Sequence, residues 1–150
     1  MNKNIIVLDS SVIVKVFVQE DDREQTIDLL KYLNLKNIKI IAPELLITET
    51  LNVCLAKNVP HDVVLGYFND LKGFGLIMPS IEQSILVSAC EIAESGNQKS
   101  GFPSFNDSVY HAMAKNHNTF FITADNRHKA KTEKVGHIVL LKDWEQIFNK

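Results

Sequence analysis

The chain has 150 residues, enough for one domain with a hydrophobic core and too few for two. Hydrophobic residues make up 45% and charged residues 23%, as in ordinary soluble globular proteins. The net charge of −2 excludes a general attraction to nucleic acid, so such a substrate needs a local basic strip or a bridging metal. Because the sequence has no signal peptide and no apolar run near the ~20 residues of a membrane helix, we expect a cytoplasmic protein without a membrane partner.

Strands and helices are expected to alternate along the chain. Residues 4–8 form a short apolar run rich in β-branched residues, which predicts a buried strand. Further strands are expected at 38–41, 76–78, 119–123 and 137–141. Helices are expected at 10–19, from 21, from 43, from 60 to 73 or 75, at 80–94, from 104 and around 144. This alternation predicts one α/β domain over residues 1–150, a three-layer α/β/α fold with a mostly parallel central sheet.

Three aspartates follow strand ends or open a helix, the places where α/β proteins build their sites. Asp9 directly follows the first strand, and Asp125 follows the apolar run that ends at Thr123. If these two strands are parallel neighbours, both carboxylates emerge at the same edge of the sheet. Asp107 is the third residue of a helix capped by Ser104, where unpaired backbone N–H groups and the helix dipole favour the ionised form.

Glu49 differs from these aspartates because it lies in the middle of an expected helix. Leu45, Glu49, Asn52 and Ala56 share one face of that helix, and no lysine or arginine stands three or four positions from Glu49. An acid in such apolar surroundings needs a partner. We therefore expect that partner to come from elsewhere in the fold, or to be a metal ion.

Electrostatics decides what a cluster of these acids can do. Two carboxylates about 4 Å apart repel by roughly 4 kcal/mol at an effective dielectric constant near 20. Several together would cancel much of the ~5–15 kcal/mol stability of a domain unless a cation joined them. Carboxylate oxygens are preferred ligands of Mg²⁺ and Mn²⁺, and such sites suit phosphodiester hydrolysis. We therefore expect a catalytic Mg²⁺ or Mn²⁺ site formed by Asp9, Glu49, Asp107 and Asp125.

Four segments that contain these acids resemble, in order, the motifs of the PIN domain family. The segments are Val7–Val12, Pro43–Asn52, Phe105–Tyr110 and Ile122–Asp125. The closest resemblance is to the VapC-type toxins of bacterial toxin–antitoxin pairs. It implies a PIN-like fold and an endoribonuclease that uses Mg²⁺ or Mn²⁺ at the four acids to hydrolyse RNA phosphodiester bonds. It also implies a cognate antitoxin protein as partner, and a homodimer.

The resemblance also assigns supporting roles to three polar side chains near the acids, Ser11, Asn52 and Thr123. A basic segment follows Asp125 directly, and its Arg127, Lys129 and Lys131 could hold RNA phosphates. A solvated turn is the alternative interpretation of this segment.

A catalytically silent PIN-like module that binds RNA or protein is the alternative function. Retention of all four acids argues against it. A haloacid dehalogenase-type phosphatase is disfavoured because Ser11 stands where its second aspartate belongs. Tyr110 and His111, close to Asp107, are interpreted as packing residues rather than as parts of the site.

Overall fold

The computed structural model describes residues 1–149 and contains a parallel sheet of five strands in the order β3-β2-β1-β4-β5. The strands are β1 (Ile5–Leu8), β2 (Lys39–Ile41), β3 (Leu76–Ile77), β4 (Phe120–Thr123) and β5 (Ile138–Leu140). Each neighbouring pair is parallel, and β1 pairs with β2 on one side and with β4 on the other. The predicted α/β fold with a parallel sheet is confirmed.

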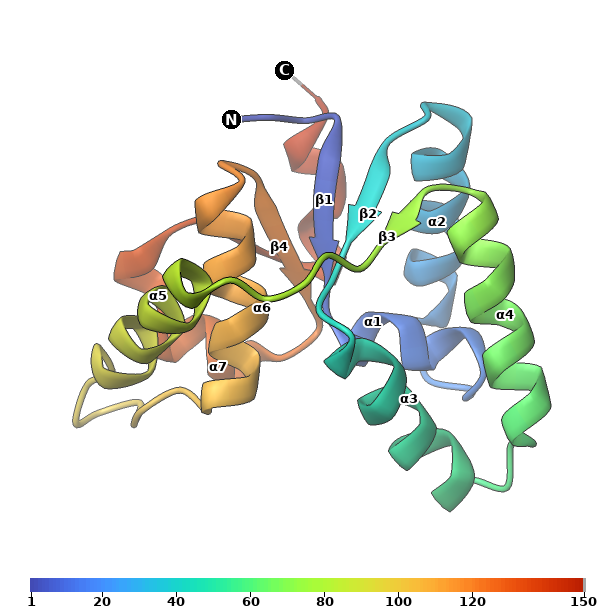
Figure 1. Cartoon of the computed structure of the whole chain (residues 1–150), viewed down its shortest axis with the longest axis horizontal. Helices are drawn as coiled ribbons and strands as arrows, with labels where there is room; N and C mark the ends of the chain where they lie inside the picture. The colour runs from blue at the N-terminus through green and yellow to red at the C-terminus, as the bar shows by residue number, and fades with distance from the viewer. Residues whose placement is uncertain (150) are drawn as a thin grey trace.

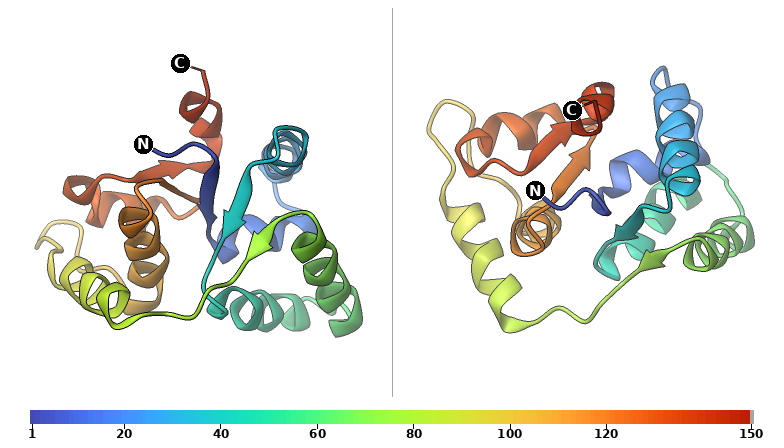
Figure 2. Two further views of the ribbon diagram at one scale, coloured as in Figure 1. Left: turned by 45° about the horizontal axis from the view of Figure 1, so that its top comes forward. Right: turned by 90° about the horizontal axis from the view of Figure 1, so that it is seen from above.

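Seven α-helices and three short 3₁₀ helices connect the strands within residues 1–149. The α-helices are α1 (Ser10–Ile13), α2 (Arg23–Leu35), α3 (Leu45–Ala56), α4 (His61–Gly73), α5 (Gln83–Glu94), α6 (Phe105–Asn116) and α7 (Asn126–Lys131). The 3₁₀ helices are η1 (Val14–Val16), η2 (Glu133–Val135) and η3 (Leu141–Ile147). Helices α1–α4 lie on one side of the sheet and α5–α7 on the other (Figures 1 and 2), as right-handed crossovers in opposite directions from β1 require.

The strand order places a topological switch point at β1. The chain moves from β1 to β2 and β3 in one direction and then returns past β1 to form β4 and β5. Connections on the two sides of β1 therefore leave toward opposite faces, and a crevice opens at the carboxyl ends of β1 and β4. Open α/β sheets bind their ligands at such a crevice.

The core consists of aliphatic and aromatic side chains from both layers of helices and from the sheet. Ile6, Val7 and Leu8 of β1 are fully buried, because helices cover this central strand on both faces. A smaller apolar cluster joins α5 to α6 through Ile85, Ala89, Ile92, Val109 and Ala112. Among the described residues, no helix is long and apolar enough to cross a membrane.

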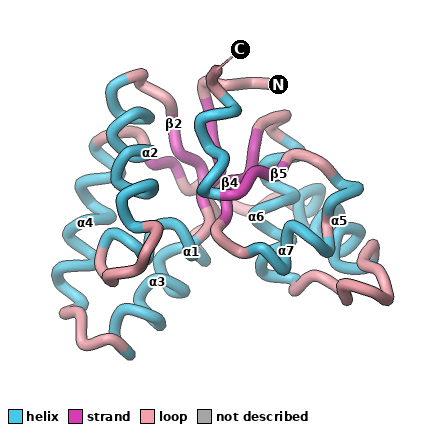
Figure 3. The backbone as a smooth tube through the Cα atoms, turned by 180° about the vertical axis from the view of Figure 1, so that it is seen from behind, coloured by secondary structure: helices cyan, strands magenta, loops and turns pink. Residues whose placement is uncertain are grey.

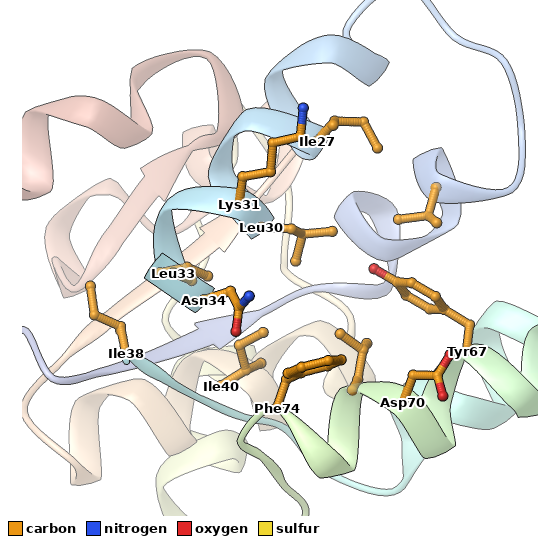
Figure 4. A pocket seen from close by; sticks show the side chains of 12 residues that line it. Ile27, Leu30, Lys31, Leu33, Asn34, Ile38, Ile40, Tyr67, Asp70 and Phe74 are labelled. Carbon is orange, nitrogen blue, oxygen red and sulfur yellow. The ribbon is translucent and has the colours of Figure 1, made fainter. Parts of the chain in front are cut away.

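An apolar groove of about 350 Å³ lies between α2 and α4 (Figure 4). Leu30 and Ile38 line one side, and Tyr67 and Phe74 of the α4 segment line the other. The groove shares no lining residue with the acidic cavity described below.

Two expected helices and one segment considered as a turn differ from the structure. The helix expected to start at Ser80 starts at Gln83, because the connection from β3 must stay extended to reach the other face of the sheet. The helix expected over 10–19 is a single α-helical turn followed by η1, and it ends at Val16. The basic segment after Asp125, considered as a solvated turn, is helix α7.

Candidate functional site

Three of the four predicted acids line one open cavity of about 380 Å³ at the carboxyl ends of β1 and β4. Asp9 directly follows β1, Asp107 lies in the first turn of α6, and Asp125 caps α7. The remaining lining residues include hydroxyl, charged and apolar side chains: Ser10, Ser11, Val14, Lys15, Glu20, Val53 and Ala124. Helices from both faces of the sheet thus bring acids to the crevice beside the central strand.

Asp9 is the most deeply buried of these acids, with 4% of its surface exposed. Its Oδ2 accepts hydrogen bonds from the hydroxyls of Ser11 at 2.8 Å and Thr123 at 2.7 Å. These hydroxyls accept in turn from the backbone N–H groups of Ala124 and Asp125, so their own hydrogens are directed at Asp9. Burial nevertheless raises the pKa of Asp9, with a further contribution from the carboxylate of Asp107.

Asp107 and Asp125 are both held by the start of a helix. Ser104 is the N-cap of α6, as predicted, and its hydroxyl accepts from the backbone N–H of Asp107 at 3.2 Å and donates to Asp107 Oδ2 at 2.7 Å. Asp125 is itself the N-cap of α7, and its Oδ1 accepts from the N–H groups of Arg127 and His128 at 2.9 and 3.1 Å. The carboxylate of Asp125 therefore satisfies backbone donors that a helix leaves free, whereas the carboxylate of Asp107 accepts from the hydroxyl of the N-cap residue Ser104.

Glu49 reaches the site from α3, on the opposite side of the sheet from α6. The hydroxyl of Tyr110, a fully buried residue of α6, donates to Glu49 Oε1 at 2.7 Å. Burial raises the pKa of Glu49, and the carboxylates of Asp9 and Asp107 raise it further. Glu49 does not line the cavity of the three aspartates, but its charge interacts with those of Asp9 and Asp107. The predicted partner of Glu49 is thus a tyrosine.

The four carboxylates share one arrangement, in which one oxygen accepts a hydrogen bond from the protein. Within residues 1–149, the second oxygen of Glu49, Asp107 and Asp125 accepts none, and the second oxygen of Asp9 accepts none from a side chain. An oxygen-only donor set of this kind fits a hard cation such as Mg²⁺ or Mn²⁺. The protein thus orients each acid through one oxygen.

The expected four-carboxylate cluster is nevertheless not closed in the structure. In the described part of the chain, no three His, Cys, Asp or Glu side chains converge closely enough to hold a metal ion. Like charges repel, and this repulsion favours carboxylates spread around the cavity. The structure therefore brings three of the acids to one cavity, and the four-carboxylate metal site stays a prediction.

The other predicted site residues occupy different surroundings. Ser11 and Thr123 contact Asp9, whereas Asn52 is exposed on α3 and does not line the cavity. The three basic residues of the segment after Asp125 all lie on α7, and none of them lines the acidic cavity: Arg127, Lys129 and Lys131.

Lys15 is a charged residue of this cavity that the sequence analysis did not identify. It is 6% exposed, and its Nζ pairs with Glu20 and with Asp22, at 2.8 Å from Asp22 Oδ1. The sequence did contain a signal for this buried residue, because Lys15 is the single lysine in the apolar stretch that contains Val12 and Val16. Charged side chains are rarely buried without a partner, so a lysine in that stretch indicates an ion pair.

Comparisons with known proteins agree with this architecture. The family model described as PIN domain matches residues 6–134. No curated protein sequence matches the chain. A solved structure titled "Structure of FitAB bound to IR36 DNA fragment" is similar with a TM-score of 0.66 and 19% sequence identity, over 91% of this chain and 94% of that chain. This likeness supports the fold. Because the family model covers most of its length, the chain belongs to the PIN domain family.

Proposed function

We propose that the chain is a metal-dependent endoribonuclease, the toxin of a type II toxin–antitoxin pair. Its reaction is the hydrolysis of RNA phosphodiester bonds, with Mg²⁺ or Mn²⁺ held by Asp9, Glu49, Asp107 and Asp125. One observation carries the proposal: in a PIN domain, three of these carboxylates line one cavity beside the central strand, and each of the four is oriented through one oxygen. RNA as the substrate class rests on the resemblance of the motifs to VapC-type toxins.

In this proposal the protein residues orient the acids and hold the substrate. A bound divalent ion would supply an activated water and stabilise charge on the leaving oxygen. Ser11 and Thr123 lower the pKa of Asp9 against the larger effect of burial, because both hydroxyls donate to it. The basic residues of α7 are placed directly after Asp125, where we propose that Arg127, Lys129 and Lys131 contact RNA phosphates.

The experiment that tests the proposal is cleavage of total RNA by the purified protein with Mg²⁺ or Mn²⁺. Asp107→Asn is the inactive variant, because asparagine retains the size of the side chain and removes its charge. Asp28→Asn is the matched control, since Asp28 is an exposed residue of α2. We expect discrete RNA fragments from the wild type and from Asp28→Asn only. Single-stranded DNA of the same sequence tests whether DNA is cut as well.

Absence of cleavage by folded wild-type protein with either metal would contradict the proposal and favour the silent binding module. The toxin role has a separate test, because expression of an active toxin without its antitoxin arrests growth. Normal growth at high expression would contradict that role. We also propose a cognate antitoxin and a homodimer as partners, and sedimentation of the purified chain tests the dimer.

Tyr110→Phe is expected to weaken Mn²⁺ binding about tenfold, as loss of a hydrogen bond to a metal ligand does elsewhere. The variant removes the donor to Glu49 Oε1, so the pKa of Glu49 rises further and its ionised form becomes less available. Calorimetric titration of the metal-free protein with Mn²⁺ measures the effect. Tyr67→Phe is the control, because Tyr67 lies in the apolar groove (Figure 4). Equal affinities of Tyr110→Phe and wild type would remove Glu49 from the proposed ligands.

A further inference from the structure

Helices α6 and α7, which carry Asp107 and Asp125, are joined one turn further along by two buried histidines. His111 follows Asp107 by four residues, and His128 follows Asp125 by three. Their side chains meet, with His111 Nδ1 and His128 Nε2 at 3.1 Å, and the residues are 0% and 3% exposed. Figure 3 shows α6 and α7 beside each other next to β4 and β5. The histidine contact thus lies one turn behind the two acids.

The hydrogen bonds determine the tautomer of each ring. His111 Nε2 lies 2.6 Å from the carbonyl oxygen of Gly136, which can only accept, so Nε2 carries a hydrogen. Burial lowers the pKa of His111 to about 4, so the ring is neutral at pH 7 and its Nδ1 is an acceptor. His128 Nε2 must therefore donate to it. A chain of hydrogen bonds runs from His128 through His111 to the turn that precedes β5.

His128 fixes the orientation of α7 in particular. Helix α7 has six residues, too few to be stable alone, so its position depends on tertiary contacts. His128 is its one buried residue. The His128 ring packs edge-on against Phe121 of β4 at 5.8 Å, and the His111 ring packs on the same phenylalanine at 5.6 Å. The N-cap residue of this helix is Asp125, so whatever orients α7 also orients that carboxylate.

The second nitrogen of His128 distinguishes this arrangement from ordinary core packing. Within residues 1–149, His128 Nδ1 is the one buried side-chain nitrogen or oxygen without a hydrogen-bond partner. The charges of Asp107 and Asp125 both act on this ring, although burial has the larger effect and lowers the pKa of His128. An apolar residue would fill the same space without an unpaired polar atom. The Nε2 contact with His111 is therefore made together with a buried, unpaired Nδ1.

We propose that the His128–His111–Gly136 chain is a positioning device that sets the placement of Asp125 relative to Asp107. The inference rests on the proposed function, because it treats both acids as parts of one metal site. His111 and His128 act through the helices and are positioning residues. Their hydrogen bond fixes the separation of α6 and α7 one turn behind the acids, and Phe121 prevents either ring from moving aside.

Two variants of His128 separate positioning from packing. In His128→Gln, the side-chain amide can still donate to His111 Nδ1. In His128→Phe, the ring volume is retained but the donor is lost. We expect His128→Phe to shift the backbone amide resonances of Asp107 and Asp125 in metal-free protein and to weaken Mn²⁺ binding at least tenfold. His128→Gln should retain wild-type resonances at both acids and bind Mn²⁺ within about threefold of wild type.

The outcomes are distinct. Unchanged amide resonances and unchanged Mn²⁺ affinity in a folded His128→Phe would overturn the inference. Equal losses of Mn²⁺ affinity in His128→Phe and His128→Gln would overturn it as well. If His128→Phe does not fold, nitrogen NMR of the two wild-type rings tests the inference. The inference requires hydrogen on Nε2 of both His111 and His128, and a ring without it would overturn the inference. Wild-type protein that binds no Mn²⁺ would contradict the proposed function alone, since the amide resonances of metal-free protein still report positioning.

Discussion

Asp9→Asn is expected to reduce metal-dependent RNA cleavage about 1,000-fold without lowering the stability of the metal-free protein. Loss of a metal ligand removes several kcal/mol of transition-state stabilisation, and about 4 kcal/mol corresponds to this factor. Stability is retained because asparagine offers the same acceptor oxygen to Ser11 and Thr123. The substitution also removes the repulsion between Asp9 and Asp107, which contributes to the raised pKa of Asp9.

Two measurements on one preparation check this expectation. Initial cleavage rates with Mn²⁺ give the loss of activity, and thermal unfolding without metal gives the change in stability. Asp28→Asn again provides the matched control. A large fall in the unfolding temperature of metal-free Asp9→Asn would identify Asp9 as a structural residue. Near wild-type cleavage by the same variant would exclude it from the catalytic site.

Acidification is expected to destabilise the protein through His111. The unfolded chain binds a proton at this histidine near pH 6.5, whereas burial lowers its pKa in the folded state to about 4. The neutral ring therefore makes its full contribution to the free energy of unfolding above pH 6.5. This contribution is lost as the pH falls toward 4. The difference of 6.5 − 4 = 2.5 pKa units corresponds to about 3 kcal/mol in total, of which about 2 kcal/mol is lost by pH 5.

Chemical unfolding at pH 7 and pH 5 of the wild type and His111→Gln measures this contribution. Asp9 and Glu49 act in the opposite direction, because their raised pKa values let the folded protein take up protons at higher pH than the unfolded chain does. The loss of unfolding free energy between pH 7 and pH 5 in the wild type, minus the same loss in His111→Gln, is the contribution of His111. His61→Gln, at the exposed start of α4, should retain the wild-type dependence. An equal loss of unfolding free energy between pH 7 and pH 5 in wild type and His111→Gln would contradict the expectation.

Local sequence patterns were sufficient to predict the fold and the meeting of three acids at one cavity. The apolar runs before Asp9 and Asp125 predicted parallel neighbouring strands, and β1 and β4 are paired in that way. Ser104 and Asp107 have the spacing of a capped first turn, and both of their mutual hydrogen bonds are present. Such features depend on residues close together in the chain, which is why periodicity and spacing reveal them.

Long-range partners could not be predicted in the same way. Tyr110 and Glu49 are 61 positions apart, and nothing local to either residue indicates the other. The contact between His111 and His128 likewise depends on how α6 and α7 pack over β4. The sequence also gave no means of judging how closely the acids converge, because that distance depends on electrostatic repulsion as well as on the path of the backbone.

The strand order also has a consequence for biosynthesis. Asp9 and Thr123 are 114 positions apart, and β1 pairs with β4 only after the chain has been synthesised through β4. At ~5–20 residues per second, a ribosome needs several seconds or more between the codons for these two residues. A nascent chain can form β1, β2 and β3 in that time, yet it lacks two of the four acids. The proposed activity therefore requires a chain that has been synthesised at least as far as Asp125.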